Sequence, residues 1–213
     1  YKRPRNRKYS QSVMKIGIYG GSFNPVHKGH IHLAETAVED FGLDTVYFVP
    51  SKISPHRSVE EYVSETDRLE MLKLVCMKNS NFHVSDYELR SERVSYSVYT
   101  VEHFRRKFPD DELFLLVGSD MLMMFDKWYC FEKILSEVTL AVVSRNSGDL
   151  DSLRKKAKKL SQYGRILISE RSPEVISSTE IRRKFGENSD FSCYLDENVV
   201  KYIRLRGLYS GNN

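Results

Sequence analysis

Residues 15–30 of the chain read Lys15-Ile16-Gly17-Ile18-Tyr19-Gly20-Gly21-Ser22-Phe23-Asn24-Pro25-Val26-His27-Lys28-Gly29-His30. The segment from Lys15 to Tyr19 is a short run with β-branched residues, and two glycines end it. From about Lys28 to Phe41, apolar residues recur at helical spacing, and Gly42 follows as a stop signal. The stretch therefore predicts a strand, a glycine-containing loop and a helix.

The same alternation continues to the end of the chain. Strands are expected at 15–19, 45–49, 82–84, 113–117, 139–143 and 166–168. Helices are expected at 28–41, from a Thr66 cap to Cys76, and at 95–108, 131–135, 150–163, 178–185 and 196–204. Alternation at this spacing indicates βαβ units. The predicted fold class is α/β, a Rossmann-like, doubly wound, mostly parallel sheet capped by two C-terminal helices.

Length and composition indicate a globular chain with one domain. The chain has 213 residues, of which 40% are hydrophobic and 29% charged. The longest apolar runs reach only five or six residues, whereas a membrane span needs about 20, so no membrane partner is expected. No apolar stretch follows the basic N-terminus, which argues against a secretory signal. We expect one domain over residues 14–213, preceded by a basic tail over residues 1–13 that is disordered.

The charge and the cysteines say little about partners. The formal charge is +4, but the tail holds five cations and no acid, which leaves −1 for the rest. No nucleic-acid partner is therefore expected, although the tail could be either an upstream extension or an RNA-binding arm. Three cysteines, each more than 50 residues from the next, form neither a disulfide framework nor a zinc motif. This predicts a reduced, cytoplasmic protein.

The loop after the first strand has the chemistry of a phosphate site. It fits neither the Walker loop nor the dinucleotide fingerprint. Gly20 and Gly21 still let backbone amides approach an anion, and the helix that follows offers free N–H groups and a positive dipole end. His27 and His30 lie three residues apart at the helix start and point the same way, with Gly29 leaving room between them.

Two other interpretations of the histidines stay open at this point. His27, His30 and His32 could be metal ligands, but no acidic residue or cysteine lies close by in the sequence. They could also be surface histidines without a role. A phosphate site is favoured because two histidines flank a glycine at a helix start.

The string from Gly20 to His30 resembles the signature of nucleotidyltransferases with a His-x-Gly-His motif, and more narrowly that of the bacterial nicotinate-mononucleotide adenylyltransferases. The resemblance extends from Met14 to about Leu208. It implies catalytic roles for His27 and His30. In this loop it implies ATP binding by Gly20, Gly21, Ser22, Phe23, His27 and His30.

A second segment, Ile176-Ser177-Ser178-Thr179-Glu180-Ile181-Arg182, is similar to the Ser-Thr-x-x-Arg motif of the same family. By itself the segment also fits a capping box of Ser177 with Glu180. The resemblance implies that Ser178, Thr179 and Arg182 bind the β and γ phosphates of ATP, and hydroxyls, free amides and a guanidinium suit such a ligand.

Three further segments are similar to the acceptor-binding parts of the family. Residues 50–57 resemble a Pro-x4-Pro-His-Lys loop, with Arg57 in place of Lys, although they could also be a plain surface loop. Residues 95–101 resemble Ser-Tyr-Thr-x-x-Thr-Leu, with Ser97 in place of Thr and Val101 in place of Leu. Residues 117–129 contain a Gly-x-Asp motif and a Trp-Tyr pair. The tryptophan, which is the only one in the chain, could also be a core residue. The resemblance implies nicotinate mononucleotide binding by Lys52, His56, Ser97, Asp120, Trp128 and Tyr129.

The resemblance implies transfer of AMP from ATP to nicotinate mononucleotide in NAD biosynthesis, with Mg²⁺ carried on ATP and no metal ligand in the protein. Adenylyl transfer to phosphopantetheine is the alternative within the same class, although that family has one glycine before Ser-Phe and lacks the Trp-Tyr pair. A nucleotide-sensing or RNA-binding module is the alternative from another class. The sequence leaves open whether the chain forms a homo-oligomer.

Overall fold

The computed structural model describes residues 12–52, 63–144, 148–171, 176–186 and 191–209. One six-stranded sheet forms its centre, with the strand order β3-β2-β1-β4-β5-β6, and each described strand pair is parallel. The strands are β1 (Lys15–Gly21), β2 (Thr45–Pro50), β3 (Phe82–Val84), β4 (Glu112–Gly118), β5 (Thr139–Val143) and β6 (Ile166–Ser169). This order reverses between β1 and β4, which is where ligands bind in doubly wound sheets. The α/β prediction is confirmed.

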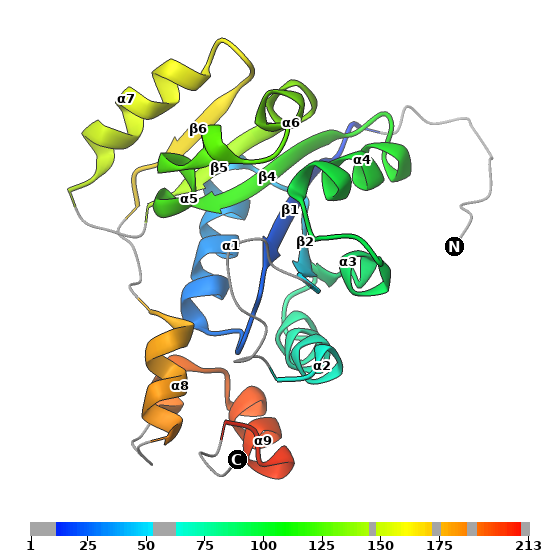
Figure 1. Cartoon of the computed structure of the whole chain (residues 1–213), viewed down its shortest axis with the longest axis vertical. Coiled ribbons are helices and arrows are strands. Elements are labelled where there is room, and N and C mark those ends of the chain that lie inside the picture. Colours follow the sequence, from blue (N-terminus) through cyan, green and yellow to red (C-terminus); the bar gives the residue numbers. More distant parts are fainter. Residues whose placement is uncertain (1–11, 53–62, 145–147, 172–175, 187–190, 210–213) are drawn as a thin grey trace.

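Helices cover both faces of the sheet (Figure 1). The longer helices are α1 (Lys28–Phe41), α2 (Glu65–Cys76), α4 (Ser97–Lys107), α6 (Phe131–Glu137), α7 (Leu150–Leu160), α8 (Ser178–Gly186) and α9 (Glu197–Arg206). Short helical turns lie at α3 (Tyr87–Arg90), α5 (Ser119–Met123), η2 (Phe125–Lys127) and η3 (Ser192–Tyr194). In the described part, no helix is both long and apolar enough to cross a membrane.

Alternate residues of the central strand face two separate hydrophobic cores. In β4, Phe114 and Leu116 pack with α1, α2, α8 and α9, whereas Leu113, Leu115 and Val117 pack with α4, α5, α6 and α7. All five are at most 4% exposed. A strand covered on both faces explains the continuous apolar run, because side chains alternate across a strand. The two cores hold the C-terminal edge of the sheet, where the strands end, in a fixed position.

The ends of the longer helices agree with the predictions at some positions and differ by one to three residues at others. Gly42 ends α1 with φ at 66°, a left-handed conformation that favours glycine, and its N–H donates to the Val38 carbonyl. The cap of α2 was predicted at Thr66, and this is wrong. Ser64 is the cap, because its side chain accepts a hydrogen bond from the Asp67 N–H, so the helix begins at Glu65.

The predicted helix over 95–108 begins two residues later, at Ser97. Tyr96 N–H donates to the Val94 carbonyl, and Ser95 Oγ accepts a hydrogen bond from Lys52 N–H at 3.1 Å. These bonds hold Ser95 and Tyr96 in a loop rather than in the helix. The helices α3 and α5 were not predicted, because four or five residues are too few to show a 3.6-residue period.

Deletion of residues 1–13 is expected to leave the melting temperature and the catalytic rate unchanged. Residues 1–11 of this predicted tail lie outside the described residues. Met14 N–H donates to Asp111, and β1 begins at Lys15, so the sheet needs nothing before Met14. Thermal unfolding and turnover of the deleted and full chains provide the measurement. A lower rate at an equal melting temperature would show that the tail has a functional role.

Candidate active site

A cavity of about 590 Å³ lies at the carboxyl ends of β1 and β4, where the strand order reverses. Its size is within the usual range of small-molecule sites. One part of its lining comes from the loop after β1, the start of α1 and the start of α8. Another part comes from the start of α4, from α5 and from the residues after η2. The topology thus brings segments that are distant in sequence around one space.

The glycine pair ends β1 at the cavity wall. Gly20, Gly21 and Ser22 all line the cavity. A Cβ atom on Gly21 would lie 3.0 Å from the Phe23 ring, so this ring closes the space beneath the loop. Phe23 itself is fully buried, has φ at 47°, and is not part of the lining. Its assignment to ATP binding stays a prediction, and its side chain supports the loop from below.

The two histidines line the cavity side by side. His27 is the N-cap residue of α1 and is 4% exposed, while His30 lies in the first turn. Their rings stack with centroids 3.6 Å apart. His27 N–H donates to His30 Nδ1 at 3.2 Å. Because Nδ1 accepts, the neutral His30 ring carries its proton on Nε2, which makes Nε2 the donor.

The three histidines of the metal alternative do not all lie on the cavity wall. His32 is described but does not line the cavity. In the parts of the chain that the structure describes, which include all three of these histidines, no group of three His, Cys, Asp or Glu side chains could hold a metal ion. The stacked pair is instead placed at the N-terminus of α1, where an anion is favoured.

The start of α8 packs against the loop after β1, although about 150 residues separate them. Ser178 lines the cavity, and its hydroxyl donates to the Pro25 carbonyl at 3.2 Å. Arg182 Nη1 donates to the Asn24 carbonyl at 2.9 Å, and Arg182 Nη2 lies 3.4 Å from Thr179 Oγ1. Thr179 and Arg182 do not line the cavity. The Ser-Thr-x-x-Arg segment is therefore part of the wall behind the glycine loop, and its three predicted residues lie close together.

The predicted acceptor residues surround another part of the same cavity. Ser97, Asp120, Trp128 and Tyr129 all belong to its lining. Trp128 packs on Phe125 at a ring distance of 4.8 Å and contacts the second core, so it is both a core residue and a wall residue. Its backbone N–H donates to the Phe125 carbonyl. Among the described residues, none accepts a hydrogen bond from the Tyr129 N–H.

The structure describes only the first residues of the segment after β2. Lys52 is described and lies outside the cavity lining. Its backbone N–H donates to Ser95 Oγ. His56 and Arg57 lie outside the described residues, so their predicted roles stay predictions.

Sequence analysis missed Glu88, a carboxyl group in the cavity wall. Glu88 is only 6% exposed, and Thr100 Oγ1 donates to its Oε1 at 2.5 Å. Burial raises the pKa of Glu88 above its usual value, although hydrogen bonds from Thr100 and Ser95 act in the other direction. Glu88 lies in the short helix α3, in a polar stretch without periodicity, so no signal in the sequence pointed to it.

Known proteins resemble this chain over most of its length. A family model described as cytidylyltransferase-like matches residues 18–184. The chain is 32% identical to the nicotinate-nucleotide adenylyltransferase of Bacillus subtilis over 197 residues, which cover 92% of this chain and 99% of that protein. It is 37% identical to a probable nicotinate-nucleotide adenylyltransferase of Carboxydothermus hydrogenoformans, with 92% and 98% covered.

A solved structure shares the fold. Plasmodium falciparum nicotinic acid mononucleotide adenylyltransferase, complexed with NaAD, superposes with a TM-score of 0.77 at 19% identity, over 93% of this chain and 98% of that one.

The stability of the Glu88→Gln variant, relative to that of the unmodified chain, is expected to increase as the pH rises. The raised pKa means that the folded state favours the neutral carboxyl, so the stability that neutral Glu88 contributes is lost as the pH rises through its folded-state pKa. Glutamine cannot ionise and can still accept from Thr100. The melting temperature of Glu88→Gln minus that of the unmodified chain should therefore increase as the pH rises above about 4.3, the ordinary pKa of a glutamate. Glu92→Gln, at an exposed position nearby, should show no such trend.

Proposed function

Because the chain belongs to the cytidylyltransferase-like family, and within it to the nicotinate-nucleotide adenylyltransferases, we propose that it transfers AMP from ATP to nicotinate mononucleotide. The products are nicotinate adenine dinucleotide, a precursor of NAD, and pyrophosphate. One observation carries the proposal beyond the family: a single cavity is lined by the glycine–histidine loop and also by the aromatic and polar residues assigned to the acceptor. A transfer between two nucleotides needs both sets of contacts in one space.

The proposed reaction is a direct displacement at phosphorus. An oxygen of the acceptor's 5′-phosphate forms a bond to the α-phosphorus of ATP, and the bond from that phosphorus to the bridging oxygen of pyrophosphate breaks. Such a transfer requires positioning and charge stabilisation more than covalent chemistry from the protein. The site offers backbone amides, imidazoles and hydroxyls for that purpose.

His30 and His27 would stabilise the α-phosphate. With its Nδ1 occupied by the His27 N–H, His30 presents Nε2–H as a donor that needs no change of protonation. Hydrogen bonds that strengthen as charge develops lower the barrier selectively. The amides near Gly21 and Ser22, at the same wall, would add to this effect.

Ser178, Thr179 and Arg182 would hold the leaving pyrophosphate. Ser178 is at the cavity wall, and the N-terminus of α8 adds its dipole. Arg182 donates one N–H to Asn24, and a guanidinium has five N–H groups, so it can keep that bond while it binds phosphate.

The acceptor would bind between Ser97, Asp120, Trp128 and Tyr129, with Lys52 and His56 near its phosphate. Because the Trp128 N–H is already bonded to Phe125, the Tyr129 N–H is the amide of this pair that can meet the carboxylate of the pyridine ring. Tyr129 is 51% exposed, and its ring lies 4.9 Å from that of Tyr96, so two aromatic rings stand at the cavity wall.

Mg²⁺ enters the proposal together with ATP, and it would neutralise charge on the phosphates. Asp120 and Glu88 are the carboxyl groups of the described lining, and Glu88 already accepts a hydrogen bond from Thr100. This donor set fits an ion held mainly by phosphate oxygens and water.

A cytoplasmic location is also part of the proposal, supported by three cysteines that form no disulfide. The absence of nucleic-acid partners stays a prediction.

A pyrophosphate-release assay tests the function. With ATP present, release is expected with nicotinate mononucleotide, and kcat/KM should be at least about tenfold lower with nicotinamide mononucleotide. A carboxylate offers two charged acceptor oxygens, whereas a carboxamide offers one neutral oxygen and an NH2 group that cannot accept from a backbone N–H. A badly paired donor costs about 1–3 kcal/mol. Equal values for both acceptors would contradict the assigned carboxylate contact.

Two other results of the same assay would overturn the proposal itself. Release only with phosphopantetheine would establish the alternative acceptor. Release with none of the three acceptors would favour a nucleotide-binding module.

His30→Ala is expected to lower kcat by about 10²–10³-fold, with a modest change in ATP affinity. It also removes the acceptor for the His27 N–H, so the melting temperature should fall by about 2–4 °C, the equivalent of roughly 1 kcal/mol. His32→Ala, on the same helix but outside the cavity lining, is the control and should keep its rate. A near-normal kcat for His30→Ala would show that the histidine is structural.

A further inference from the structure

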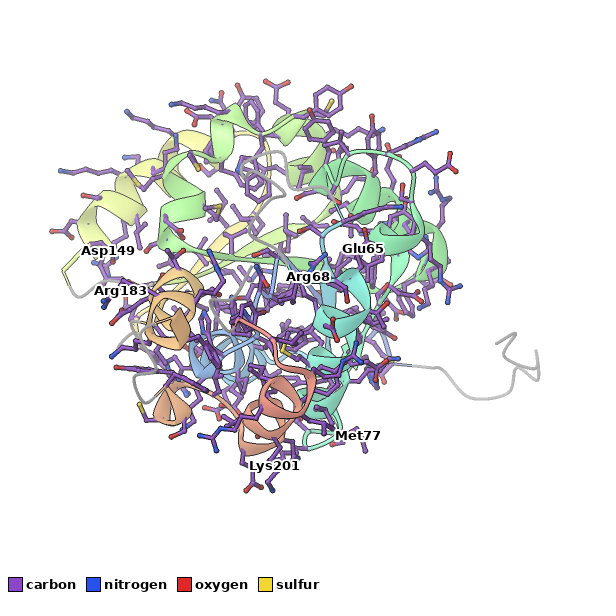
Figure 2. All side chains as sticks on the ribbon, turned by 60° about the horizontal axis from the view of Figure 1, so that its bottom comes forward. Glu65, Arg68, Met77, Asp149, Arg183 and Lys201 are labelled. Carbon is purple, nitrogen blue, oxygen red and sulfur yellow. The ribbon has the colours of Figure 1, made fainter. Side chains whose placement is uncertain are left out.

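The turn from Ser22 to Val26 is held in place by side chains from distant parts of the chain. Arg68 Nη1, from α2, donates to the Ser22 carbonyl at 2.7 Å. The hydroxyl of Tyr209, which lies beyond the end of α9, donates to Asn24 Oδ1 at 2.7 Å. Val63 N–H approaches the same oxygen less closely, at 3.4 Å. Figure 2 shows Arg68 near the middle of the molecule, in agreement with its 1% exposure.

Asn24 lies inside the turn rather than on the cavity wall. Its exposed fraction is 0%, and it does not belong to the lining. Ser22 and His27, on either side of it in the sequence, both line the cavity. The position of Asn24 therefore fixes how a backbone amide and an imidazole are placed relative to each other.

Tyr209 is held in an unusual conformation at this position. Its φ is 62°, in the left-handed region that residues other than glycine rarely adopt. Such a conformation persists where surrounding contacts impose it, and it tends to occur at functional positions. The Tyr209 ring packs against Phe185 of α8, with centroids 5.2 Å apart. Burial raises the pKa of the Tyr209 phenol, so it stays a hydrogen-bond donor at physiological pH.

The fold explains how a residue near the C-terminus reaches this turn. Figure 1 shows α8 and α9 together at one end of the molecule, with α9 close to α2. Gly207 ends α9 with φ at 62°, and the chain then returns so that the hydroxyl of Tyr209 meets Asn24. The contact spans 185 residues of sequence.

We propose that Tyr209 is a positioning residue that holds Asn24 and, through it, the arrangement of the Ser22 amide and His27 in the site of the proposed adenylyl transfer. Donors that stabilise a transition state contribute most when they are held in place beforehand. The inference rests on the proposed function for its kinetic consequence, but its structural consequence can be measured without any substrate.

Tyr209→Phe removes the hydroxyl and keeps the ring that packs on Phe185. We expect kcat for AMP transfer to fall about three- to tenfold, the equivalent of one hydrogen bond, with an unchanged KM for nicotinate mononucleotide. The acceptor is bound by other elements, so a general loss of structure would change both constants. In the absence of substrate, hydrogen exchange of the amides from Ser22 to His27 should become faster.

Tyr202→Phe is the matched control. Tyr202 lies in α9 and donates to Asp67 Oδ1 at 2.8 Å, so the variant loses a hydroxyl of the same kind that does not touch the turn. It should leave kcat and the exchange of the turn unchanged. Equal effects of the two variants, or no effect of Tyr209→Phe on either measurement, would overturn the proposal.

A double-mutant cycle keeps the test decisive if a variant proves less stable than expected. In an Asn24→Ala background, the additional Tyr209→Phe change should alter the exchange of the turn by less than twofold, since its partner is gone. A full additional effect would show that Tyr209 does not act through Asn24. Pyrophosphate release by the unmodified chain decides the proposed function separately, because the exchange measurements need no turnover.

Discussion

Buried backbone carbonyl groups must find hydrogen-bond donors, and this constraint governs the turn between β1 and α1. Three carbonyls of the turn, and that of Gly21 at the end of β1, accept from donors outside it. Ser51 N–H bonds to Gly21, Arg68 to Ser22, Arg182 to Asn24, and Ser178 to Pro25. The donors come from the end of β2, from α2 and from α8. The hydrogen bonds of this turn are therefore complete only when α2 and the distant helix α8 have packed against it.

The strand order places the two halves of the proposed reaction next to each other. Since the order reverses between β1 and β4, the loops after these strands diverge and leave a space between them. The loop after β1 carries the histidines, and the loop after β4 carries Asp120 and leads to Trp128. Two buried cores, one on each face, fix the strands from which both loops start. The sheet therefore limits how far the groups on these two loops can move relative to each other.

The cavity wall contains little fixed negative charge where two anionic nucleotides would bind. The raised pKa of Glu88 shifts this carboxyl toward its neutral form, and its bonds to Thr100 and Ser95 tie α3 to the start of α4. Ser95 in turn accepts from the Lys52 N–H, so the loop after β2 joins the same network. A hydroxyl network of this kind gives the acceptor side a defined shape at low electrostatic cost.

Local patterns in the sequence determined the strands and the long helices, and they pointed to the loop after β1 as the candidate phosphate site. The apolar run from Leu113 to Val117 predicts a central strand, and Gly42 predicts the end of α1, because these signals act within a few residues. The residue types from Gly20 to His30 predicted an anion site, and their resemblance to a family motif narrowed that prediction to ATP. The sequence also indicated both possibilities for Trp128, which proves to be a core residue and a cavity residue together.

Only the tertiary structure decided which side chains hold that loop and which complete the cavity. Arg68, Glu88 and Tyr209 carry no motif, and two of them act on residues 46 and 185 positions away. Such contacts depend on how α2 and α9 pack on the sheet, not on any local periodicity. Short helices such as α3 escape prediction for a related reason, since their few residues are set by hydrogen bonds to neighbouring elements. Periodicity encodes which face of an element is buried, whereas the partner of a buried polar group is known only once the elements have packed together.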